Sequence, residues 1–237
     1  MKNGHPVPQT TTLHAQYDVI ANDYNDSIAI INSFQSKFYK RNLPKTRGSL
    51  LDVGCGTGDI LAQLAKYFTR SYGIDPMGKF VSLAQQKARH SDIQLGTAER
   101  LDFNDETMDC VISHIVFQHV DREQAVKEAV RVLKPGGKLI ISEVLAKDAP
   151  KRLPVYRFIK QIRFNYYLVI RYGYKKAKRA KMYQKSSDWR KLTAIHRGRR
   201  FDSQRLYDFY NKMLPGVTFK QIDSRMISAI WEKPRHR

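Results

Sequence analysis

The sequence lacks the features that mark secreted, membrane-spanning and metal-binding proteins. It has two cysteines in 237 residues, Cys55 and Cys110, and they form neither a disulfide framework nor a metal-binding spacing. No run of about 18 apolar residues is present, and no apolar segment follows Met1, so we expect neither a membrane span nor secretion. The motifs H-E-x-x-H, paired C-x-x-C and G-x-S-x-G are also absent, so we expect no metal site and no serine nucleophile. These absences together predict a cytoplasmic protein.

Acidic residues are scarce as well, and most of the imbalance lies in one segment. The whole chain has 42 Lys and Arg against 22 Asp and Glu, a net charge of +20. Residues 147–200 contain 18 of these basic side chains and two acids, so the rest of the chain is almost neutral. Charge concentrated in this way indicates an anionic partner or surface, and peripheral binding to the inner membrane surface is one such case.

Three glycines at alternate positions, Gly54, Gly56 and Gly58, follow an apolar run that ends at Asp52. Glycine takes positive φ readily and leaves room for a ligand near the backbone. Apolar residues at helical spacing over 59–68 predict a helix directly after this loop, with the loop amides near its N-terminus. A dinucleotide fingerprint would need glycine in place of Asp59, and a triphosphate loop would need G-K-[ST]; neither is present.

The stretch Asp52–Gly58 reads D-V-G-C-G-T-G, which resembles motif I of the class I S-adenosylmethionine-dependent methyltransferases, D-x-G-x-G-x-G, at every fixed position. The resemblance implies that S-adenosylmethionine is the cofactor. It also implies that the loop binds this cofactor through Asp52, Gly54, Cys55, Gly56 and Gly58.

A second acid, Asp75, ends the next short apolar run, 71–74. A carboxylate at the end of this strand can accept hydrogen bonds from both ribose hydroxyls of an adenosine. The sequence G-I-D-P-M at 73–77 looks like the family's second motif. The resemblance implies that Asp75 holds the ribose, and that Pro76 and Met77 belong to the same site, with Met77 against the adenine.

A third stretch, G-T-A-E-R-L-D-F at 96–103, resembles the family's G-D-A-E-x-L-P-F, whose loop contacts the adenine edge. We therefore include Thr97, Ala98 and Glu99 among the cofactor-binding residues. The chain departs from the pattern at Thr97, where the family has Asp, and at Asp102, where it has Pro. A threonine hydroxyl accepts the adenine hydrogen bond without a charge, so the resemblance implies weaker cofactor binding.

Two histidines follow the fourth predicted strand, in the segment His114–Val120 that matches the place where the transferred methyl group lies in the family. A histidine is a suitable general base near neutral pH, so His119 and His114 are the candidate bases, and His114 is also a candidate cofactor contact. A predicted helix over 10–39 adds Tyr17, a candidate cofactor contact, and Tyr24, a candidate catalytic residue.

The chain is long enough for one α/β domain with additions. We expect a doubly wound, seven-stranded Rossmann-like methyltransferase sheet with an antiparallel end, as the family has. The expected parts are an N-terminal tail and lid helix (1–48), a cofactor-binding α/β core (49–146), a basic helical insert (147–200), and a C-terminal helix with the last two strands (201–237). Expected helices are 59–68, 79–90, 122–133 and 201–214, and expected strands after the first are 71–74, 93–95, 108–113, 138–144, 217–223 and 226–231.

The acceptor must be inferred from the insert, for which four interpretations remain open: a solvated charged helix, an anionic-membrane surface, an RNA-binding surface, or a clamp for a phosphorylated or carboxylated small molecule. The stretch Tyr17–Tyr24, Y-D-V-I-A-N-D-Y, is similar to the lid of small-molecule methyltransferases. The resemblance therefore implies a small, anionic or membrane-associated acceptor in biosynthesis. Two alternatives remain: an RNA methyltransferase that docks through the insert, and an inactive methyltransferase-like binding factor.

Overall fold

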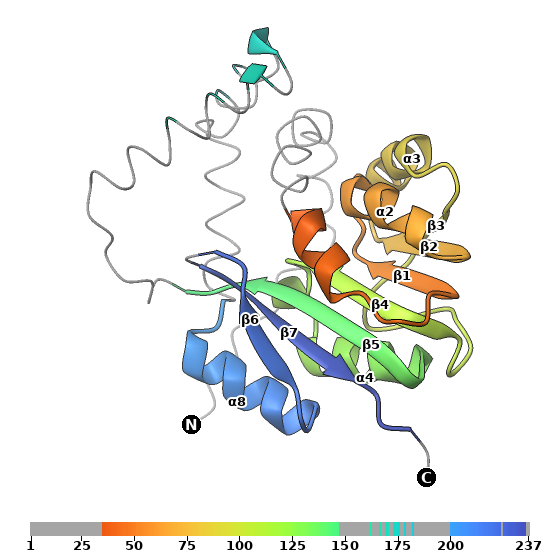
Figure 1. The fold of residues 1–237 in the computed structure, drawn as a ribbon, viewed down its shortest axis with the longest axis vertical. Helices are drawn as coiled ribbons and strands as arrows, with labels where there is room; N and C mark the ends of the chain where they lie inside the picture. The colour runs from red at the N-terminus through yellow and green to blue at the C-terminus, as the bar shows by residue number, and fades with distance from the viewer. Residues whose placement is uncertain are drawn as a thin grey trace.

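A single seven-stranded sheet organises the chain. The computed structural model describes residues 35–146, 200–223 and 225–235, with single positions between 162 and 182. The strand order is β3-β2-β1-β4-β5-β7-β6. The first five strands in this order are parallel to one another, and β7 runs antiparallel to both β5 and β6. This order confirms the predicted doubly wound sheet and its antiparallel end (Figure 1).

The described helices and strands follow the predicted sequence of elements. The strands are β1 (Ser49–Val53), β2 (Arg70–Asp75), β3 (Asp92–Leu95), β4 (Met108–His114), β5 (Leu133–Val144), β6 (Thr218–Gln221) and β7 (Met226–Glu232). The helices are α2 (Asp59–Leu64), α3 (Gly78–Lys87), α4 (Arg122–Val132) and α8 (Ser203–Met213), with 3-10 turns η1 (Ala65–Tyr67) and η2 (Phe117–His119). Residues 35–42 are also helical.

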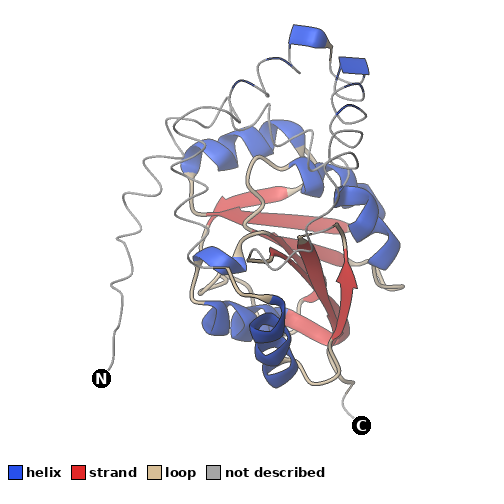
Figure 2. Cartoon of the chain, turned by 90° about the vertical axis from the view of Figure 1, so that its left-hand side faces the viewer, coloured by secondary structure: helices blue, strands red, loops and turns tan. Residues whose placement is uncertain are grey.

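Both faces of the sheet are buried, as expected for a parallel sheet with helices on each side. One core contains the apolar residues of α4 and α8 together with Val111 and Leu139 from the sheet. The other core contains those of α2 and α3 together with Tyr39 and Ile112. Figure 1 shows α4 and α8 below the sheet and α2 and α3 above it, and Figure 2 shows the strands between the helices.

Several predicted boundaries were wrong. The helix expected to reach residue 68 ends at Leu64 and tightens into η1. Residues 41 and 42, which lie beyond the helix predicted over 10–39, are also helical. Strand β5 begins at Leu133 rather than residue 138, because Leu133 pairs with Met108 on β4 before a register shift, so the Pro-Gly-Gly segment lies inside the strand. Strand β6 spans only Thr218–Gln221.

The predicted N-terminal lid and basic insert lie largely outside the described residues. Of the helix expected over 10–39, the structure describes residues 35–39, and these are helical. Tyr17 and Tyr24 fall outside the described part, as does nearly all of 147–200. Within the part of the chain that the structure describes, no helix is both long and apolar enough to cross a bilayer.

Candidate functional site

The glycine loop connects β1 to α2 at the carboxyl end of the parallel strands. Gly54, Gly56 and Gly58 all have positive φ, of 72°, 55° and 79°. A Cβ at Gly54 would lie 2.3 Å from Val116 Cγ2, and one at Gly58 would lie 2.8 Å from the Ala84 Cα, so both positions require glycine. A Cβ at Gly56 would meet nothing within 4 Å of the described residues. The loop is therefore held tightly at both ends and open at its middle, where a ligand can approach the backbone.

Asp75 lies beside this opening and is held by two backbone amides. Its Oδ2 accepts a hydrogen bond from the Gly56 amide at 2.9 Å, and its Oδ1 accepts one from the Met77 amide at 3.0 Å. A carboxylate has about four acceptor positions, so each oxygen retains capacity for a ligand hydroxyl. This arrangement fixes the carboxylate at the edge of the loop, as an acid that holds a ribose must be fixed.

Asp52 is a second buried carboxylate in the same place, near the end of β1. Burial, reinforced by the charge of Asp75, raises the pKa of Asp52 to about 8. Burial also raises the pKa of Asp75, to about 6, against the lowering effect of the two amides that it accepts. Both carboxyl groups resist ionisation in this buried site. A cationic ligand stabilises their ionised forms, so the site favours binding of a cation.

The donor set fits S-adenosylmethionine, which combines a ribose with a cationic methionine end. Asp75 provides a fixed acceptor for hydroxyls, Asp52 provides negative charge when ionised, and Gly56 leaves space beside the backbone. Met77 is buried against Phe80, while Pro76 is exposed.

Cys55 and Asp59 have structural partners. The Cys55 amide donates to the Ile74 carbonyl, and burial raises the pKa of its thiol. Asp59, at the start of α2, forms a salt bridge of 2.7 Å with Lys87 at the end of α3. Asp59, which stands where a dinucleotide fingerprint would have glycine, therefore links α2 to α3.

The backbone turns sharply where β4 ends. Ile115 has a φ of 61°, an uncommon and strained conformation for a β-branched residue. Its amide donates to the Ser142 carbonyl at 2.8 Å, which fixes the turn against β5. The turn places Val116 against Gly54, so the end of β4 closes directly on the glycine loop.

The two candidate bases have different surroundings in this segment. His114 Nδ1 lies 3.2 Å from the Tyr39 hydroxyl, and its Nε2 is enclosed without a hydrogen-bond partner among the described residues. Burial lowers the pKa of His114 to about 4, so its imidazole is neutral at pH 7. His119 Nε2 lies 3.0 Å from Gln118 Nε2 and accepts from that amide nitrogen, so its lone pair is already used.

The residues of the third predicted stretch have different surroundings. Ala98 is buried and Thr97 is exposed. Glu99 Oε1 accepts from the Asp121 amide at 3.2 Å, which supports the start of α4. The cofactor roles of these three residues remain predictions.

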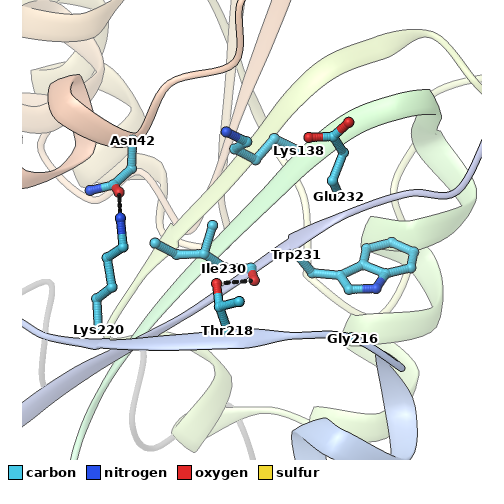
Figure 3. Close-up of a pocket in the computed structure, with 8 residues that line it drawn as sticks. All are labelled: Asn42, Lys138, Gly216, Thr218, Lys220, Ile230, Trp231 and Glu232. Atoms are coloured by element: carbon cyan, nitrogen blue, oxygen red, sulfur yellow. Dashed lines mark hydrogen bonds between the residues drawn. The ribbon is translucent and has the colours of Figure 1, made fainter.

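A cavity of about 280 Å³ lies elsewhere, between the helix of residues 35–42 and the antiparallel end of the sheet (Figure 3). It is lined by Asn42, Lys138, Gly216, Thr218, Lys220, Ile230, Trp231 and Glu232. Lys138 pairs with Cys110 on β4, and Cys110 pairs with Leu50 near the start of β1. The cavity therefore faces the amino half of the parallel strands and is separate from the glycine loop.

Several residues near the site were not among the sequence candidates. Tyr39 and Ser142 contact each other beside His114, and Glu143 binds Arg122 and the Tyr210 hydroxyl. Ser142 and Glu143 directly follow the apolar run 139–141 of β5, and this change to polar residues was a usable signal. The sequence around Tyr39 did not indicate a place near this site, because its contacts are with residues more than 70 positions away.

Comparison with known proteins agrees with this arrangement. Residues 51–141 match the family described as a methyltransferase domain. The ubiquinone/menaquinone biosynthesis C-methyltransferase UbiE of Geotalea daltonii is 33% identical over 146 residues, covering 55% of this chain and 62% of that protein. The demethylmenaquinone methyltransferase of Lactobacillus johnsonii is 37% identical over 134 residues, covering 52% of this chain and 55% of that protein. The chain thus matches less than two thirds of the length of either relative.

Solved structures show the same fold at low sequence identity. A SAM dependent methyltransferase from Aquifex aeolicus superposes with a TM-score of 0.55 at 15% identity, covering 83% of this chain and 87% of that one.

Proposed function

We propose that this chain, which belongs to the class I S-adenosylmethionine-dependent methyltransferase superfamily, transfers a methyl group from S-adenosylmethionine to a small acceptor in biosynthesis. The observation that carries this proposal is the Asp75 carboxylate, held by the Gly56 and Met77 amides beside an open glycine loop. Bound there, S-adenosylmethionine supplies an electrophilic methyl group on a sulfonium.

The acceptor that we propose is an electron-rich aromatic ring bearing hydroxyl groups, of the quinol class. The support is the names of two relatives, one a ubiquinone/menaquinone biosynthesis C-methyltransferase and the other a demethylmenaquinone methyltransferase. A ring carbon beside a hydroxyl becomes a good nucleophile when that hydroxyl loses its proton. Such a reaction needs a proton acceptor near the methyl group, as well as alignment of the ring.

His114 is the proton acceptor that the geometry favours. It ends β4 next to the turn that closes on Gly54, and its Nε2 has no protein partner among the described residues. His119 is less suitable because its Nε2 already accepts from Gln118. The buried, neutral imidazole of His114 can take a proton as the ring gains its methyl group.

The proposal is tested by incubating the protein with methyl-labelled S-adenosylmethionine and three acceptor pools: a demethylated quinol, total RNA and phospholipid vesicles. We expect label in the quinol. Two variants are compared in this assay. Asp75→Ala removes the proposed ribose contact, and the matched control Asp102→Ala changes an exposed loop position outside the proposed contacts. Asp75→Ala should lose labelling through weaker cofactor binding, and Asp102→Ala should retain it.

Two outcomes would contradict the proposal. Label that enters RNA in preference to the quinol would show that the acceptor is RNA and not a quinol. A protein that labels none of the pools and binds no cofactor would be a methyltransferase-like binding factor.

A further inference from the structure

The hydroxyl of Tyr39 lies at a junction of polar groups from β4 and β5. The Tyr39 side chain is fully buried on the same face of the sheet as α2 and α3. Its Oη lies 2.8 Å from Ser142 Oγ, 3.0 Å from the Ser113 carbonyl oxygen and 3.2 Å from His114 Nδ1. A phenol has one proton to donate, so at most one of these contacts is a hydrogen bond from Tyr39.

The neighbouring serines determine where that proton goes. Ser228 Oγ donates to the Ile141 carbonyl at 3.1 Å, and Ser142 Oγ donates to Ser228 Oγ at 3.3 Å. Both serine protons therefore point away from Tyr39. With the Ser142 proton directed at Ser228, the 2.8 Å contact between Tyr39 Oη and Ser142 Oγ is a hydrogen bond only if Tyr39 donates. The Tyr39 proton therefore goes to Ser142 Oγ, the shortest of the three contacts, and a lone pair of the Tyr39 oxygen faces His114.

The direction of the Tyr39 hydrogen bond determines which ring nitrogen of His114 carries the proton. Because the facing oxygen is an acceptor, Nδ1 must be the donor and must carry the hydrogen. A neutral imidazole has one N–H, so Nε2 carries a lone pair. That Nε2 is buried and lacks a hydrogen-bond partner among the described residues, which is costly unless a ligand provides one.

We propose that Tyr39 is a positioning residue that holds His114 with its proton on Nδ1, so that Nε2 accepts a hydrogen bond from a hydroxyl of the methyl acceptor. This inference rests on the proposed function. The acceptor's hydroxyl proton passes to Nε2 while a ring carbon forms its bond to the methyl carbon and the sulfur–methyl bond breaks. The ring C–H proton then moves to the ring oxygen, which restores the phenol, and the imidazolium releases one proton to water.

The first test needs no acceptor. Nitrogen-15 NMR of the histidine-labelled full chain at neutral pH distinguishes protonated from unprotonated ring nitrogens, and His114→Gln identifies the signals. We expect a protonated Nδ1 and an unprotonated Nε2 in the wild-type protein. A proton on Nε2 instead would overturn the inference.

The second test removes the hydroxyl. Tyr39→Phe keeps the buried ring and should shift His114 toward a mixture of both tautomers. The control is Tyr210→Phe, another fully buried tyrosine, whose hydroxyl bonds Glu143. Tyr210→Phe should leave the His114 signals unchanged, and an unchanged spectrum in Tyr39→Phe would also overturn the inference.

The third test separates positioning from folding. With the quinol as acceptor, Tyr39→Phe should lower kcat about 10-fold, while KM and the cofactor Kd stay within about twofold. A kcat equal to that of the wild type would contradict the positioning role. Since the NMR spectrum is recorded without acceptor, a protein that shows the expected tautomer but methylates nothing would refute the proposed function alone.

Discussion

Replacing Asp52 with asparagine should stabilise the ligand-free protein at pH 8. Asp52 is buried on β1, where burial and the neighbouring Asp75 raise its pKa to about 8. The folded state therefore binds this proton more tightly than the unfolded chain does. The stability that results is complete below about pH 4 and is lost as the pH rises toward 8. Asparagine has nearly the same shape and does not titrate, so the variant avoids this loss.

The expected gain in stability follows from the raised pKa of Asp52. Each pKa unit corresponds to about 1.36 kcal/mol, so ionising Asp52 within the fold costs on the order of 5 kcal/mol more than in the unfolded chain. Relaxation and water entry reduce such penalties in proteins, and we expect about 3 kcal/mol at pH 8. For a chain of this size, that corresponds to a rise in Tm of about 6–12 °C.

The assay is thermal unfolding of the ligand-free protein between pH 5 and pH 8. The matched control is Asp109→Asn, because Asp109 is also buried but has the opposite shift. Burial acts to raise the pKa of Asp109, but hydrogen bonds from Lys134 and Ser49 outweigh it, and the pKa is lowered. A group with a lowered pKa contributes stability above its unfolded pKa, so Asp109→Asn should lower Tm throughout this range.

The reasoning would be refuted by a Tm difference between Asp52→Asn and wild type that does not grow from pH 5 to pH 8. It would equally be refuted if Asp52→Asn lowered Tm at pH 8 as Asp109→Asn does.

Two further substitutions test the packing around the site. Gly54→Ala should lower both Tm and cofactor affinity because its Cβ would lie 2.3 Å from Val116 Cγ2. Gly56→Ala, whose Cβ would have no atom of the described residues within 4 Å, should cost only the strain of its positive φ, about 1–3 kcal/mol. Equal losses of stability in urea unfolding would contradict this. Glu143→Gln should destabilise the fold by about 3–5 kcal/mol, because the Arg122 guanidinium forms a 2.8 Å ion pair with Glu143 and its side chain is only 10% exposed, so it would lack a countercharge in a mostly enclosed position. A change in unfolding free energy below about 1 kcal/mol would show that water reaches this pair.

The arrangement of the glycine loop and Asp75 was predictable from sequence because it depends on local geometry and on topology. Alternate glycines fix a turn, and an acid that ends a parallel strand lies at the same edge of the sheet as its neighbours. The glycine loop and Asp75 therefore come together as predicted, joined by the hydrogen bond from the Gly56 amide.

The surroundings of His114 were not predictable, because long-range packing overrides local preference there. Isoleucine disfavours positive φ, yet Ile115 has a φ of 61°, and its amide is held by a hydrogen bond to the Ser142 carbonyl on β5. Tyr39 contacts Ser113 and Ser142, which are 74 and 103 positions away, so no local pattern places it. Pairing with β4 at Leu133 and again at Lys138 likewise places the Pro-Gly-Gly segment inside β5, although the strand was predicted to begin at residue 138.

Calorimetric titration with S-adenosylmethionine tests the central claim most directly. We predict saturable binding to the wild-type protein, and affinity reduced by about tenfold or more in Asp75→Asn, because one charge-assisted hydrogen bond to the ribose is lost. No heat at millimolar cofactor, or an Asp75→Asn variant that binds as tightly as wild type, would contradict the assignment of this loop as the cofactor site.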